Sequence, residues 1–135
     1  MQDRIAWDES IRVGVAEFDE AHRTLIGIAN ELIAASEANQ QDGVVGAVLE
    51  GLIEYTESHF QREEALMEQT RYPELEEHRR QHRLLMNQVY LFKSQFIAGE
   101  VDANAMVRFL RDWILTHIQD HDRRYSPHLH AHGIS

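Results

Sequence analysis

The sequence contains no cysteine. This absence excludes disulfide bonds, thiolate zinc sites, cysteine-ligated iron–sulfur clusters and a cysteine nucleophile. Any metal would therefore have to be held by imidazole nitrogen and carboxylate oxygen. The 9 histidines and 23 acidic residues supply both kinds of donor in quantity.

Proline, glycine and long apolar runs are also scarce. Two prolines and seven glycines among 135 residues, with 43% hydrophobic residues, favour one folded, helix-rich domain over a disordered chain. No run of about 18 apolar residues is present, so we expect no membrane insertion. Residues 1–10 lack the basic start and apolar stretch of a secretory signal. The expected location is therefore cytoplasmic.

Basic residues are few compared with acidic ones. Thirteen Lys and Arg face 23 Asp and Glu, which gives a formal net charge of −10. Nucleic-acid binding depends on clustered positive charge, so we expect no nucleic-acid partner. The pairs Arg79-Arg80 and Arg123-Arg124 stand among acids and are interpreted as solvated helix faces. Glu64 is likewise interpreted as a solvent-facing charge.

Apolar residues recur every three or four positions in four segments, which predicts four helices. The predicted helices cover about residues 19–37, 43–68, 73–97 and 103–123. An arm, residues 1–18, precedes them, and a loosely packed tail, residues 124–135, follows. Asp19 and Asp102 are expected to cap the first and fourth helices, and Pro127 to stop the fourth. Tyr125 is expected to be a helix-end anchor.

Four helices of similar length joined by short turns predict an all-α fold. The predicted architecture is an up-down-up-down four-helix bundle with an N-terminal arm and a short C-terminal tail. We expect it to form a single domain over residues 1–135 and to be a monomer.

Histidines occupy positions that the helical period assigns to the core. The five are His22, His59, His78, His82 and His117. Each alone is more readily explained as a hydrogen-bonded core histidine than as a metal ligand. Five such positions, with Glu63 in the same pattern, are not independent. A buried imidazole or carboxylate without a partner is costly, and a shared cation would satisfy them together.

The spacing and the topology bring these groups to one place. Four residues separate His59 from Glu63, and four separate His78 from His82, so each pair points from one side of a helix. In an alternating bundle, the starts of the first and third helices meet the ends of the second and fourth. The residues at those four places are His22, Glu63, His78 and His117.

One ligand is left open by the helical period. After His117, the residue at i+4 is His121, whereas Asp122 at i+5 lies about 140° away around an ideal helix. Periodicity alone therefore favours His121.

The order His, His-x3-Glu, His-x3-His and His-x4-Asp resembles the hemerythrin family, in particular the single-domain bacterial hemerythrins. The flanking residues are also similar: Val13-Gly-Val, Phe18-Asp-Glu-Ala-His22, Tyr72-Pro73 and Trp113 before His117. The resemblance spans about residues 7–133. It implies that Asp122, rather than His121, is a ligand. It also implies one iron held by His78, His82 and His117, a second held by His22 and His59, and bridging by Glu63 and Asp122.

The resemblance further implies reversible dioxygen binding at a non-haem di-iron centre with an oxo or hydroxo bridge. Dioxygen would be the ligand at the second iron, which has one open position. The expected role is oxygen transport, storage or delivery, with no enzyme activity, no catalytic residues and an oxygen-consuming protein as a potential partner. Residues expected to wall the oxygen pocket are Leu25, Phe60, Trp113, Ile114 and Ile118.

Three other functions remain open from the sequence. A di-iron oxidase or peroxidase of the ferritin-like type would use Glu-x-x-His motifs. None of the five core histidines has a Glu three residues before it. Oxygen or redox sensing through a partner is a second alternative, and a zinc site a third, because imidazole and carboxylate also suit zinc.

Overall fold

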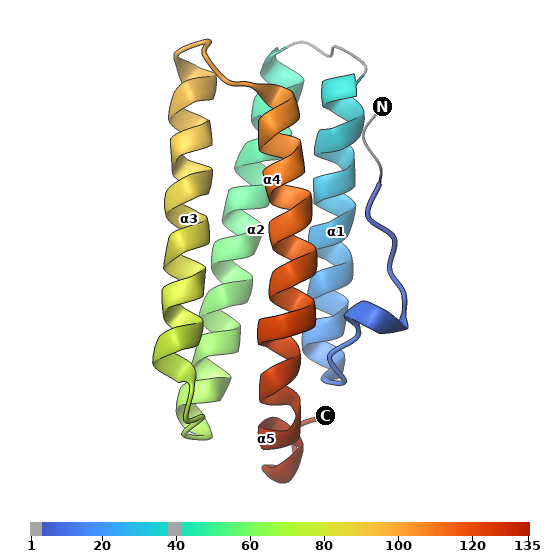
Figure 1. Cartoon of the computed structure of the whole chain (residues 1–135), viewed down its shortest axis with the longest axis vertical. Helices are drawn as coiled ribbons and strands as arrows, with labels where there is room; N and C mark the ends of the chain where they lie inside the picture. The colour runs from blue at the N-terminus through green and yellow to red at the C-terminus, as the bar shows by residue number, and fades with distance from the viewer. Residues whose placement is uncertain (1–3, 38–41) are drawn as a thin grey trace.

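The computed structural model describes residues 4–37 and 42–135. Four long helices run alternately up and down the bundle (Figure 1). They are α1 (Ala16–Glu37), α2 (Asp42–Gln69), α3 (Leu75–Ile97) and α4 (Ala103–Thr116). Helix α1 packs against α2 and α4, and α2 packs against α3. The predicted all-α, up-down-up-down bundle is confirmed.

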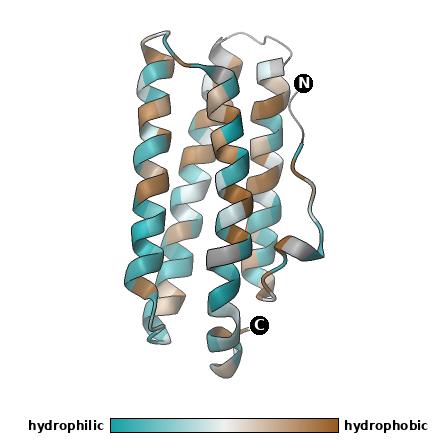
Figure 2. Ribbon diagram, in the orientation of Figure 1, coloured by the Kyte–Doolittle hydropathy of each residue, from teal (hydrophilic) through white to brown (hydrophobic). Residues whose placement is uncertain are grey.

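The helices bury one face each. Hydrophobic residues recur as bands along every helix (Figure 2). The half of the bundle away from the histidines is filled by buried apolar side chains such as Leu32, Leu49, Phe92 and Met106. No helix in the described part of the chain has an apolar stretch long enough for a bilayer.

The N-terminal arm is tied to α1 by a carboxylate. Helix α1 begins at Ala16, so the prediction that Asp19 is its N-cap is wrong. Instead the buried Asp19 carboxylate accepts hydrogen bonds from the backbone N–H groups of Val13, at 2.8 Å, and Gly14, at 3.1 Å. Gly14 has a φ of +84°, a conformation that glycine adopts without strain. The arm also contains a short 3₁₀ turn, η1 (Glu9–Ile11).

The fourth helix changes its hydrogen-bonding pattern within the predicted span. Its N-cap is Asp102 as predicted, because the carboxylate accepts from Ala105 N at 3.1 Å. Regular α-helix ends at Thr116, and a π-helical segment, η2 (His117–His121), follows. A 3₁₀ turn, η3 (Asp122–Tyr125), then leads to the C-terminal helix. The prediction of one continuous helix over about residues 103–123 is therefore wrong.

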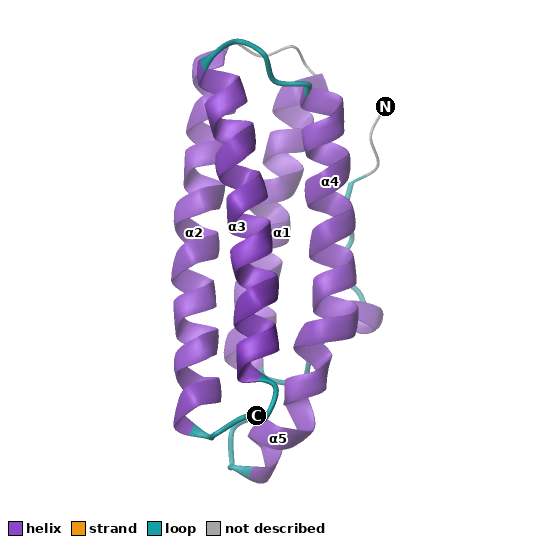
Figure 3. Ribbon diagram, turned by 60° about the vertical axis from the view of Figure 1, so that its left-hand side comes forward, coloured by secondary structure: helices purple, strands orange, loops and turns teal. Residues whose placement is uncertain are grey.

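The C-terminal tail is helical and packed. Pro127 does not stop α4; it lies in the first turn of α5 (Ser126–Ala131), where proline is well tolerated. Leu129 is completely buried beneath the bundle. Helix α5 follows η3 and lies at the end of the bundle where α2 ends and α3 begins (Figure 3). The expectation of a loosely packed tail is wrong.

Candidate metal centre

Seven ionisable side chains from α1, α2, α3 and the η2–η3 segment that follows α4 meet inside the bundle. Their relative exposures do not exceed 6%, and Glu63 is completely inaccessible. They are His22 from α1, His59 and Glu63 from α2, His78 and His82 from α3, His117 from η2 and Asp122 from η3. All seven residues proposed as ligands from the sequence are thus brought together, at one end of the bundle.

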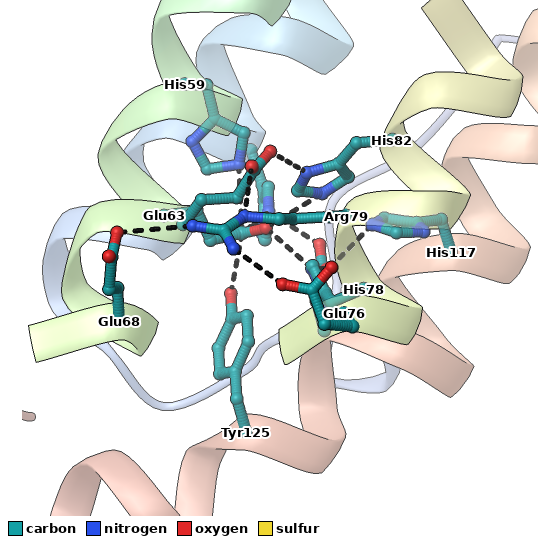
Figure 4. Close-up of polar contacts among 12 residues, drawn as sticks. His59, Glu63, Glu68, Glu76, His78, Arg79, His82, His117 and Tyr125 are labelled. Atoms are coloured by element: carbon teal, nitrogen blue, oxygen red, sulfur yellow. Dashed lines mark hydrogen bonds and ion pairs between the residues drawn. The ribbon is translucent and has the colours of Figure 1, made fainter. Parts of the chain in front are cut away.

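Glu63 stands at the centre of the group (Figure 4). Its Oε1 lies 2.8 Å from His78 Nε2 and 3.1 Å from His82 Nε2. Its Oε2 lies 3.2 Å from His59 Nε2 and 3.8 Å from His22 Nε2. One carboxylate therefore faces nitrogen atoms from three helices, with each oxygen turned to a different pair of histidines.

Asp122 joins the group because the backbone forms a π-turn. Its N–H donates to the carbonyl of His117, an i→i+5 hydrogen bond that widens the turn. This wider turn places residue i+5 beside residue i, which an ideal α-helix would not do. Asp122 Oδ1 consequently lies 2.8 Å from His117 Nε2 and 3.1 Å from His78 Nε2, while Oδ2 lies 3.0 Å from His22 Nε2.

The close nitrogen and oxygen atoms are incompletely paired by hydrogen bonds. Within the described part of the chain, no well-aligned hydrogen bond satisfies the buried Nε2 atoms of His22, His59 and His82 or Oδ1 of Asp122. These atoms nevertheless lie close to carboxylate oxygens or imidazole nitrogens of the same cluster. Ligand atoms about 2.1 Å from one ion, at right angles, lie roughly 3 Å apart. The separations above therefore suit shared cations better than a hydrogen-bond network.

The donors divide into two overlapping groups, and within each group the donor atoms lie within 4.8 Å of one another. One contains Glu63, His78, His82, His117 and Asp122; the other contains His22, His59, Glu63 and Asp122. The two carboxylates belong to both groups. The three remaining histidines of the first group and the two of the second are not shared. This arrangement suits two cations bridged by two carboxylates.

Without cations, protons take their place. Burial opposes the charged form of His22, but contacts with Asp122 and Glu63 outweigh it and raise its pKa to about 9. The same competition raises the pKa of His78 to about 10. Burial also opposes ionisation of Glu63 and Asp122, yet neighbouring histidines hold both pKa values well below their usual range. A cation entering the site must therefore displace protons from imidazoles.

Two residues that contact the cluster were misjudged from the sequence. The Tyr125 hydroxyl donates to Glu63 Oε2 at 3.0 Å, and the side chain is completely buried. It contacts the site rather than only anchoring a helix end. Glu64 accepts from His82 Nδ1 at 2.7 Å, so it is not simply a solvent-facing charge. Their positions in the sequence could have indicated these contacts, because Glu64 follows the proposed ligand Glu63 and Tyr125 stands three residues after the proposed ligand Asp122.

The five residues predicted to wall an oxygen pocket separate into two kinds of contact. Phe60 stacks on His82 with ring centroids 3.6 Å apart, and Trp113 stacks on His117 at 4.2 Å. Leu25 and Ile114 instead line a small apolar cavity. Ile118 is buried in the core but is not among that cavity's lining residues.

The cavity lies about one helical turn away from the layer of histidines. Leu25, Thr56, Leu85 and Ile114 each stand three residues from a histidine, on α1, α2, α3 and α4 respectively. Leu52, Met86, Val89 and Leu110 complete its lining. The contributions of Thr56 and Leu85 were missed, although their i±3 spacing from His59 and His82 was readable.

The remaining histidines have other places. The side chain of His121, the ligand favoured by periodicity alone, lies outside the described residues. In the tail, His128 Nε2 and the carbonyl of Thr70 are 2.7 Å apart, and His130 Nε2 and the carbonyl of Gly14 are also 2.7 Å apart. These two histidines tie α5 to the end of α2 and to the arm.

Fold and site together define a four-helix-bundle protein that holds cations between imidazole and carboxylate groups. Residues 13–129 match the model of the hemerythrin HHE cation binding domain. Bacteriohemerythrin of Stenotrophomonas maltophilia is 32% identical over 95% of this chain and 83% of its own. Bacteriohemerythrin of Methylococcus capsulatus is 33% identical over 84% and 86%. A crystal structure of wild-type hemerythrin superimposes with a TM-score of 0.86, at 29% identity, over 93% of this chain and 97% of that one. The chain belongs to the hemerythrin family.

Proposed function

We propose that the protein binds two iron ions and uses them to bind dioxygen reversibly, as an oxygen carrier, store or delivery protein. The observation that carries the proposal is the pair of overlapping donor groups that share Glu63 and Asp122. Membership of the hemerythrin family supports iron as the metal and dioxygen as the ligand.

The proposed ligands are divided unequally. One ion would be held by His78, His82 and His117, the other by His22 and His59, with Glu63 and Asp122 common to both. An ion held by only two nitrogen donors would have room for an external ligand. When bound, an iron pair would supply that open position and the electrons for reversible dioxygen binding.

The protein's own residues have to hold the ions and keep water away. The seven donors are buried, and Phe60 and Trp113 cover the outer faces of two imidazoles. The cavity between Leu25 and Ile114 offers an apolar space one helical turn from the histidines, and Thr56 is among its lining residues. Exclusion of water and of stray proton donors favours release of unchanged dioxygen over its further reduction.

The test begins with metal-free protein loaded anaerobically with iron(II). We expect two irons per chain, a visible absorption band on addition of oxygen, and loss of that band when oxygen is removed under argon. His22→Leu should reduce the iron content to about one per chain and abolish the reversible band. His132→Leu, which changes an exposed tail histidine outside the cluster, is the matched control and should leave both unchanged.

Three results would contradict the proposal. Failure of the wild-type protein to bind two irons per chain would refute the proposed metal site. An iron-loaded protein without a reversible band would favour a sensing or enzymatic role. Rapid turnover with hydrogen peroxide and a reducing substrate would identify a peroxidase, whereas we expect none above the rate of autoxidation.

A further inference from the structure

The imidazole of His82 is restrained on three sides. Its Nε2 lies 3.1 Å from Glu63 Oε1, in the centre of the metal site. Its Nδ1 lies 2.7 Å from Glu64 Oε2, on the opposite edge of the ring. Its face stacks on Phe60, with the ring planes inclined by only 3°. The ring can therefore neither flip nor tilt without losing a contact.

The partner of Nδ1 determines the tautomer of His82. An ionised carboxylate only accepts hydrogen bonds, so Nδ1 must carry the proton. In the neutral ring, Nε2 then carries the lone pair and points toward Glu63, where an ion would be held. His22 provides a contrast, because within the described residues its Nδ1 has no hydrogen-bond partner.

Helix geometry explains why two neighbouring glutamates have different roles. Adjacent residues on a helix point about 100° apart. Glu63 therefore enters the centre of the bundle, whereas Glu64 faces the seam between α2 and α3, with its side chain 24% exposed. The two Glu64 oxygens lie 2.7 Å from His82 Nδ1 and 3.3 Å from Arg79 Nε, and these contacts with basic groups favour the ionised carboxylate.

Arg79 holds Glu64 in this position. Its Nε lies 3.3 Å from Glu64 Oε1, which leaves Oε2 directed at His82. The guanidinium is itself held by Glu76 at 2.7 Å, and the largely exposed Glu68 lies 3.2 Å from it (Figure 4). The result is a chain of contacts from the surface, through Arg79 and Glu64, to a proposed metal ligand.

We propose that Glu64 is a positioning residue that fixes the orientation and tautomer of His82 and thereby sets the affinity and reduction potential of the ion that His82 holds. The inference rests on the proposed metal binding. A carboxylate hydrogen-bonded to the far nitrogen makes an imidazole a stronger donor, which stabilises the more highly charged ion. Glu64 should therefore strengthen metal binding and favour the ferric over the ferrous state.

Three variants separate hydrogen bond from charge. Glu64→Gln keeps an oxygen that can accept from Nδ1 but removes the negative charge. Glu64→Ala removes both. Glu68→Gln is the matched control, because Glu68 contacts Arg79 on the same seam but has no contact with His82. Circular dichroism of the metal-free proteins checks that each variant folds. If Glu64→Ala does not fold, the nearly isosteric Glu64→Gln still tests the proposal.

The experiment measures cobalt(II) affinity by titration of the metal-free proteins and the reduction potential of the iron-loaded proteins. Loss of such a partner typically weakens metal binding by about 10- to 100-fold, so we expect this loss for Glu64→Ala and a smaller one for Glu64→Gln. Both variants should have a higher reduction potential than wild type. Glu68→Gln should match wild type in both measurements.

The outcomes distinguish this inference from the proposed function. If wild-type protein binds neither cobalt nor iron, the metal site itself is refuted. If wild type binds both metals but the Glu64 variants match Glu68→Gln in affinity and potential, only the role of Glu64 is refuted. A loss of affinity in Glu64→Ala with no change in potential in either variant would also refute it, because a merely structural defect would produce that result.

Discussion

Replacing Tyr125 with Phe tests whether the metal-free cluster depends on hydrogen bonds to Glu63. The hydroxyl donates to Glu63 Oε2 at 3.0 Å, and both side chains are completely buried. A hydrogen bond to a charged group contributes about 1.5–3 kcal/mol. At roughly 4 °C per kcal/mol for a chain of this size, the metal-free variant should melt about 6–12 °C below wild type.

The measurement is thermal and urea unfolding followed by circular dichroism, with and without bound metal. Tyr90→Phe is the matched control, because its hydroxyl contacts Glu57 at an exposed position and its loss should cost no more than about 0.5 kcal/mol. In the loaded protein, cations would supply Glu63 with other partners, so the effect of Tyr125→Phe should shrink. Equal stability of the two Phe variants without metal would refute the reasoning.

Three further outcomes are expected. Since His22 and His78 have raised pKa values in the metal-free protein, their stabilising effect is present below pH 6.5 and lost as pH rises through 9 to 10. The melting temperature of the metal-free protein should therefore fall between pH 7 and 10, while the rise in melting temperature caused by bound metal becomes larger. A metal-induced rise that stays constant over this pH range would contradict the reasoning. Leu129→Ala should cost roughly 2–5 kcal/mol in urea unfolding, because its side chain is fully buried, and an unchanged midpoint would mean that α5 is not part of the core. Thr56→Val replaces the hydroxyl of a cavity-lining residue with a methyl group. Loss of one hydrogen bond that lowers the autoxidation barrier by about 1 kcal/mol should slow autoxidation roughly fivefold, measured as the absorbance decay of the oxygenated protein. An unchanged rate would show that the hydroxyl has no part in autoxidation.

The end of the bundle at which the proposed ligands meet could be predicted from the sequence. The helical period of 3.6 residues assigns each residue to a face of its helix, so a histidine on the face expected to be apolar can be recognised from the sequence. Up-down connectivity then places the start of α1 beside the end of α2, so His22 and Glu63 had to be neighbours. That inference uses only helix order and residue number, both of which the sequence contains.

The turn after α4 could not be predicted in the same way. An i→i+5 hydrogen bond differs from the usual i→i+4 bond by one residue, and no local residue type demands it. The structure shows it between Asp122 N and His117 O. Periodicity therefore favoured His121, and only the family resemblance pointed to Asp122. Such a turn can be recognised from the sequence only when the ligand position is already known from a family pattern, as for Asp122.

Glu64 and Tyr125 show a second limit. A helical period reports which face a residue occupies, but not whether a residue at the boundary contacts a neighbour across a seam. Glu64 lies at such a boundary, and its partner His82 comes from another helix. Tyr125 comes after regular helix has ended, where no period assigns it a face.

The last residues of the arm and α5, which a simple bundle does not require, lie at the end of the bundle that carries the proposed metal site. Phe18, at the start of α1, packs edge-on against His59 and Tyr125, with ring centroids 5.9 and 5.4 Å apart. His130 of α5 contacts the arm at the carbonyl of Gly14, and His128 contacts the carbonyl of Thr70, just after α2. A bundle whose polar cluster lies near its end would otherwise be open to water there, and water would pair with the donors and compete with a cation. These two segments close that end, so the cluster stays buried even though it lies far from the middle of the helices.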